Sequence, residues 1–161
     1  MKLLVLTTIL LTLIYNIVLV KRNKGIPPSL SHSFYVFGGN PGGYVFYGYL
    51  VAMFAMLIVP MIEATPEKWE FLPFLALASL CFVGAAADFL EEKQTRTVHV
   101  LSAIVAAALS VLWCVAVGYW FIPLVLAVVV AYPIYKNPIN KIYWLEIGCF
   151  VSVFITLIKL L

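Results

Sequence analysis

The sequence has very few charged residues, and this scarcity excludes most soluble folds. Only 11% of its 161 residues are charged, while 65% are hydrophobic. Soluble domains carry about 25% charged residues. A water-soluble fold of this size would therefore lack the polar side chains needed to cover its surface. The composition predicts an integral membrane protein.

The sequence also lacks the features of several functional classes. Its net charge is only +3, and its longest basic run is KRNK (21–24), so no basic stripe is available to bind nucleic acid. It contains no G-x-S-x-G, no H-E-x-x-H and no nucleotide-binding motif. The three cysteines stand far apart in apolar runs, without the spacing of a zinc site or a disulfide framework. We expect no cofactor and no bound metal. The cysteines are Cys81, Cys114 and Cys149.

Long apolar runs are what the sequence does contain. A transmembrane helix needs about 20 apolar residues to cross about 30 Å of hydrocarbon, and only helices or closed barrels satisfy their backbone groups in lipid. We expect an all-α polytopic bundle, with a single transmembrane domain over residues 1–161 and six helices arranged as three hairpins. The first run is longer than a signal-peptide core and lacks a cleavage site, so we interpret it as an anchor helix. The expected spans are 3–20, 44–62, 71–89, 98–117, 119–135 and 142–158.

The basic residues predict the orientation of these spans. Cytoplasmic connections carry an excess of Lys and Arg. The connections after the first, third and fifth spans hold more of these residues than the opposite side of the bundle. We therefore expect a cell-membrane protein with these three connections in the cytoplasm and both termini extracytoplasmic. The first side carries Lys21, Arg22, Lys24, Lys93, Arg96, Lys136 and Lys141, and the other side carries Lys2, Lys68 and Lys159.

Polar residues gather at the expected cytoplasmic end, within the stretch ADFLEEKQTRTVHVLSA (87–103) and near it. Glu146 is the most informative of them, because a carboxylate at mid-bilayer costs about 2.5–3.5 kcal/mol. It either pairs with a nearby cation or handles a ligand. His99 is either a histidine at the level of the lipid headgroups or a group for proton transfer or metal binding. The candidate ligand-binding residues are His99, Glu146, Asp88, Ser102, His32 and Asn16.

A metal-dependent hydrolase acting on lipids is one alternative function. His32 and His99, together with Asp88 or Glu146, could supply the three protein ligands of a catalytic zinc ion. This set loosely resembles the membrane hydrolases of the alkaline ceramidase and adiponectin-receptor type. Those enzymes use a Ser, an Asp and three His in seven helices, two of the His as H-x-x-x-H. This chain has two His and no H-x-x-x-H, so no residue of that family is assigned here.

Three stretches carry a second resemblance, which covers most of the chain. The segments PPSLSHSFY, FLPFLALASLCFVGAAADF and VHVLSA are similar to an uncharacterised family of small multi-pass bacterial and phage membrane proteins. The resemblance implies the six-helix architecture. It implies no activity, because none is assigned to that family.

The sequence favours a non-enzymatic membrane protein that binds a ligand, assists a partner or forms oligomers. Its expected partners are the lipid bilayer and either a second copy or another membrane protein. A small-solute transporter or channel subunit is the other alternative, although the middles of all six expected spans are apolar and a solute path needs polar groups. We expect any ligand site at the cytoplasmic face, around His99, Glu146 and Asp88.

Overall fold

The computed structural model describes residues 1–39 and 41–161, and this part of the chain is all-helical, with no strand. Two short 3-10 turns, η1 (Glu67–Trp69) and η2 (Pro138–Asn140), precede α4 and α7. The α-helices are α1 (Lys2–Asn23), α2 (Ser33–Val36), α3 (Tyr44–Glu63), α4 (Phe71–Ala85), α5 (Lys93–Ala116), α6 (Phe121–Lys136) and α7 (Lys141–Leu160).

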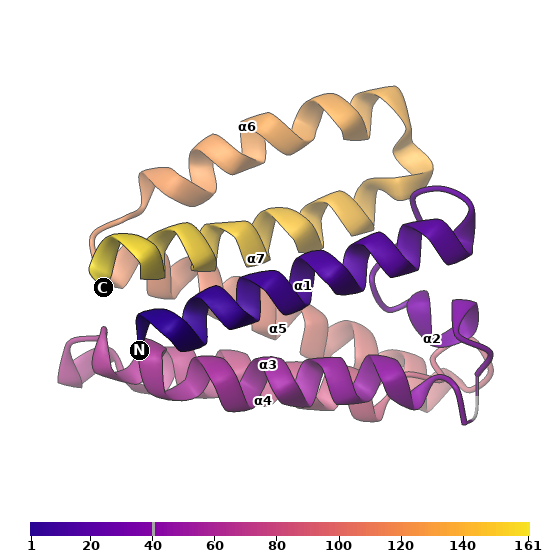
Figure 1. The fold of residues 1–161 in the computed structure, drawn as a ribbon, viewed down its shortest axis with the longest axis horizontal. Helices are drawn as coiled ribbons and strands as arrows, with labels where there is room; N and C mark the ends of the chain where they lie inside the picture. Colours follow the sequence, from indigo (N-terminus) through magenta and orange to yellow (C-terminus); the bar gives the residue numbers. More distant parts are fainter. Residues whose placement is uncertain (40) are drawn as a thin grey trace.

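The long helices form a bundle in which each runs antiparallel to the next along the chain (Figure 1). The pair α3 and α4 lies at one edge, the pair α6 and α7 lies at the opposite edge, and α1 and α5 lie between them. Both termini are at one end of the bundle. The short helix α2 and the loop before it cover the other end (Figure 1).

Five helical stretches in the described residues are long and apolar enough to cross a membrane. The helix α6 is equally apolar but has 16 residues, which gives it a length of about 24 Å. The structure therefore confirms a helical bundle with several helices long and apolar enough to cross a membrane, whereas the prediction of six spans is not confirmed. The five stretches are Lys2–Asn23, Tyr44–Glu63, Glu67–Ala85, Lys93–Ala116 and Pro138–Leu160.

The turn between α4 and α5 lies closer to the start of the chain than the sequence predicts. We expected spans over 71–89 and 98–117, but α4 ends at Ala85 and α5 begins at Lys93. The last carbonyls of a helix have no partner inside the helix. Here the carbonyl of Val83 accepts a hydrogen bond from the ring of His99 instead. The early start of α5 places His99 in the second turn of that helix.

The segment between α1 and α2, residues 24–32, is called the Pro–Pro loop below. It begins at Lys24, whose φ of 55° is left-handed, and the N–H of Gly25 caps α1 by donating to the carbonyl of Val20 at 3.1 Å. The prolines at 27 and 28 then prevent a new helix from starting at once. The carbonyl of Pro28 accepts a hydrogen bond from the N–H of Tyr143 at 3.0 Å. This bond satisfies a free donor in the first turn of α7 and places the loop on that helix.

Candidate ligand-binding cavity

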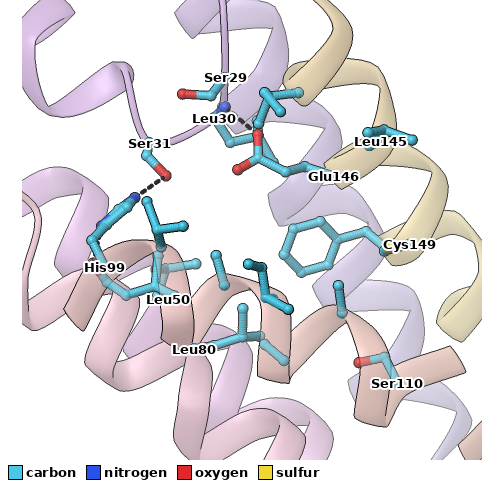
Figure 2. Close-up of a pocket in the computed structure, with 18 of the residues that line it drawn as sticks. Ser29, Leu30, Ser31, Leu50, Leu80, His99, Ser110, Leu145, Glu146 and Cys149 are labelled. Atoms are coloured by element: carbon cyan, nitrogen blue, oxygen red, sulfur yellow. Dashed lines mark hydrogen bonds between the residues drawn. The ribbon is translucent and has the colours of Figure 1, made fainter. Parts of the chain in front are cut away.

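A cavity of about 530 Å³ lies between α3, α4, α5, α7 and the Pro–Pro loop. Most of its wall is apolar, and the polar side chains that line it are concentrated near the loop (Figure 2). Ser110 is the exception, because it lies deeper along α5. The polar end is formed by Ser29, Ser31, His99 and Glu146, and the apolar wall includes Leu50, Leu80, Ala107, Cys149, Phe150 and Val153.

The cavity opens on the side of the bundle between α5 and the start of α7. Five residues from α5, η2 and α7 line the cavity and are also at least 45% exposed. All five are aliphatic. In a membrane, this opening would face acyl chains rather than water. The residues are Val100, Ile104, Ile139, Ile142 and Leu145.

His99 is held rigidly on the α5 side of the polar end, with only 5% of its surface exposed. Its Nδ1 lies 3.0 Å from the carbonyl oxygens of both Val83 and Ala86. Because a carbonyl can only accept, Nδ1 carries the proton, and Nε2 is then an acceptor. Nε2 lies 2.9 Å from Oγ of Ser31, which donates to it. The ring of Phe89 stacks on the imidazole at 4.3 Å.

Glu146 stands on the α7 side of the same end (Figure 2). Its Oε2 accepts a hydrogen bond of 2.6 Å from the backbone N–H of Leu30. Together with the bond between Tyr143 and Pro28, this contact fixes the Pro–Pro loop on α7 at two points. The other carboxylate oxygen faces the cavity (Figure 2). The short bond from this backbone N–H means that the loop and the carboxyl group of Glu146 position each other.

Asp88 lies outside the lining of this cavity and holds α2 instead. Its Oδ1 accepts a hydrogen bond from the hydroxyl of Tyr35 at 3.2 Å, and that hydroxyl accepts one from the N–H of Leu90 at 2.8 Å. Burial, together with the nearby Asp88 carboxylate, raises the pKa of Tyr35 above its ordinary value of 10.0. The phenol therefore remains protonated and joins α2 to the connection between α4 and α5.

The three remaining candidates also lie outside the cavity lining. Asn16 links α1 to α7, because its Nδ2 donates to the carbonyl of Thr12 at 2.8 Å and its Oδ1 accepts from the hydroxyl of Tyr143 at 3.0 Å. His32 is half-buried at the start of α2, and Ser102 is half-buried about one turn beyond His99 on α5. The structure gives Asn16 a structural role and places His32 and Ser102 outside the cavity lining.

Of the six candidates, the structure brings His99 and Glu146 together at one cavity. The polar end is completed by Ser31, Ser29 and the N–H of Leu30, which were not among the residues predicted from the sequence. The Pro-Pro pair was the one sequence feature that pointed to these residues, because a rigid turn can hold the hydroxyl residues beside it in a fixed place. It did not show which hydroxyl faces inward.

Residues 1–39 and 41–161 contain no group of three or more His, Cys, Asp or Glu side chains placed to hold a metal ion. His99 uses both ring nitrogens on protein groups. This arrangement therefore gives no support to the zinc hydrolase alternative.

Comparisons with models of known protein families, with curated proteins and with solved structures found no match. The resemblance to a family of small bacterial and phage membrane proteins remains a prediction.

Proposed function

We propose that this protein is a multi-pass membrane protein that binds an amphipathic, lipid-like molecule. The apolar part of the ligand would lie in the cavity, and its polar head would lie near Ser31, His99 and Glu146. The observation that carries the proposal is the division of the cavity into an apolar body and a polar end. Its volume of about 530 Å³ is within the range of about 300–1,000 Å³ that is usual for ligand pockets.

The apolar wall of the cavity favours occupancy by a lipid. The apolar wall of an empty cavity of about 530 Å³ would lose its dispersion contacts. Water fills polar cavities and leaves apolar ones dry. Because this cavity has an apolar wall and opens between Ile104 and Ile142, an acyl chain from the bilayer is the available filling.

The chemistry of the polar end indicates the kind of head that would bind. The second oxygen of the Glu146 carboxyl group faces the cavity (Figure 2) and can accept hydrogen bonds there. A head that carries hydrogen-bond donors, such as a hydroxyl, an amide N–H or an ammonium group, would complement it. Ser29 could serve the same head as donor or acceptor.

We further propose that all six long helices cross the membrane, with the polar end of the cavity in the cytoplasmic leaflet. α6 runs from the end of the bundle where α5 stops to the end where α7 starts (Figure 1). It therefore extends between the same two ends of the bundle as its neighbours. Membranes adjust to a short helix by local thinning. The basic connections support this orientation, in which both termini are extracytoplasmic.

A solute transporter is less well supported by the cavity. A route across the bilayer needs polar or ionisable groups along its length. The polar lining of this cavity is gathered at one end, and beyond it only Ser110 interrupts the apolar wall. A site that receives one amphipathic molecule from the side fits this distribution better.

Two neighbouring alanines of α5 provide a test with a matched control. Ala107 lines the cavity and is half-buried, while Ala108 is exposed and lies outside the lining. In native mass spectrometry of protein released from lipid nanodiscs, we expect wild type and Ala108→Phe to retain a lipid. We expect Ala107→Phe to lose it by at least about tenfold, equivalent to about 1.4 kcal/mol. Equal retention by all three proteins, or no retention by wild type, would contradict the proposal.

A further inference from the structure

We infer that Ser31 and His99 form a nucleophile–base pair that cleaves an acyl ester in the bound lipid. This inference rests on the proposed function, because the lipid must first enter the cavity. Both side chains line the cavity, and Oγ of Ser31 lies 2.9 Å from Nε2 of His99. A nucleophile within hydrogen-bond reach of a base that a third group orients is the usual geometry of nucleophilic catalysis.

The base is oriented by backbone carbonyls. The oxygens of Val83 and Ala86 each lie 3.0 Å from Nδ1, so they hold the proton on that nitrogen and leave the lone pair of Nε2 directed at Ser31. The same two carbonyls would stabilise the imidazolium that forms when Nε2 takes a proton. The stacked ring of Phe89 prevents the imidazole from turning away.

The pair lies where the ester of a bound lipid would lie. A glycerolipid carries its ester bonds between the polar head and the acyl chains. Ser31 and His99 lie at the polar end, across the cavity from the carboxyl group of Glu146 and beside the apolar body (Figure 2). A lipid with its chain in the cavity would bring its head and its ester bond to this end, where the ester carbonyl would lie between Glu146 on one side and Ser31 on the other.

The reaction would proceed in two balanced halves. Oγ of Ser31 attacks the ester carbonyl carbon while its proton moves to Nε2 of His99. The bond from that carbon to the alcohol oxygen then breaks, and His99 returns the proton to the leaving alcohol. A water molecule, deprotonated by His99, next attacks the acyl–serine ester and releases the fatty acid and free Ser31. The net change is ester plus water to acid plus alcohol.

The backbone N–H of Leu30, the residue before Ser31, is the donor at this end for the negative oxygen of the intermediate. It already holds a carboxylate oxygen of Glu146. A lipid head whose donors attract that carboxylate would free the N–H for the oxyanion. Binding of the head and exposure of this donor would therefore be coupled.

The test uses the full chain in nanodiscs and a long-chain alkyl fluorophosphonate, which modifies activated serines. We expect a single adduct, mapped by peptide mass spectrometry to Ser31. The adduct should be absent from Ser31→Ala and at least about tenfold less abundant in His99→Phe, which keeps a ring in place. Ser102→Ala and His32→Ala are the matched controls, and both should be labelled as wild type is. Release of fatty acid from a monoacylglycerol should follow the same order.

The outcomes separate this inference from the proposed function. If wild type retains lipid but carries no adduct on Ser31, the catalytic pair is wrong and the binding function stands. If wild type retains no lipid, the proposed function itself fails. An adduct on Ser31 that His99→Phe leaves at full strength would overturn the role of His99 as base. Because mapping on wild type needs no variant, misfolding of a variant cannot hide the result.

Discussion

Replacing His99 should destabilise the protein much more than replacing its other histidine. The ring makes three hydrogen bonds, to the carbonyls of Val83 and Ala86 and to Ser31. Hydrogen bonds between membrane helices contribute about 0.6 kcal/mol each on average, so His99→Phe should cost about 2 kcal/mol of unfolding free energy. His99→Ala also loses the stacking on Phe89. That loss adds about 0.5–1.5 kcal/mol, for a total of about 2.5–3.5 kcal/mol.

Reversible unfolding in mixed micelles, with an increasing fraction of SDS, measures these differences. Tryptophan fluorescence reports the transition, because Trp113 is fully buried. The matched control is His32→Ala. Its ring is half-buried and tilted against Tyr35 at 5.8 Å, so a change within about 0.5 kcal/mol is expected. If His99→Ala were as mild as His32→Ala, the reasoning that His99 caps α4 and anchors the Pro–Pro loop would be refuted.

Three further predictions concern the surroundings of the cavity. Glu146→Ala should lower the free energy of unfolding by about 1–3 kcal/mol, because it leaves the N–H of Leu30 without an acceptor. Glu146→Gln should lower it less. Hydrogen exchange at the N–H of Leu30 should rise only in the alanine variant. The pKa of the Tyr35 phenol is raised above 10.0, so the stability that this phenol contributes should be lost as pH rises above 10. Tyr35→Phe removes this titration. The difference in tyrosinate absorbance between wild type and variant, plotted against pH, should therefore have its midpoint above pH 10. Gly84→Val should cost about 1–3 kcal/mol, because even a Cβ would lie 2.8 Å from the ring of Tyr47; a melting temperature equal to wild type would contradict this.

The helical architecture was predictable because lipid leaves a backbone few choices. Apolar runs of the required length give helices in the described chain at 2–23, 44–63 and 141–160, close to the expected spans. The end of α4 was not predictable in the same way. It depends on a hydrogen bond from His99, which lies 16 residues beyond Val83 along the chain, and no local pattern reports such a contact.

The candidate site was predictable only in its two most unusual residues. Glu146 and His99 attracted attention because ionisable groups are rare in apolar runs. Ser31 did not, because two similar serines flank it in PPSLSHSF, and only the docking of the Pro–Pro loop on α7 decides which of the three meets His99. The cavity itself depends on how α3, α4, α5 and α7 pack, which composition does not determine.

Photo-crosslinking with a lipid that carries a diazirine near the end of its acyl chain tests most directly whether a lipid occupies the cavity. Leu80, Ala107 and Phe150 lie on three different helices, line the cavity and are half-buried. We predict adducts on these three residues after irradiation in nanodiscs, and their loss when an unlabelled lipid is added in excess. Adducts confined to outward-facing residues, such as Leu124 and Val128 of α6, would show that lipid only surrounds the bundle and would contradict the binding function.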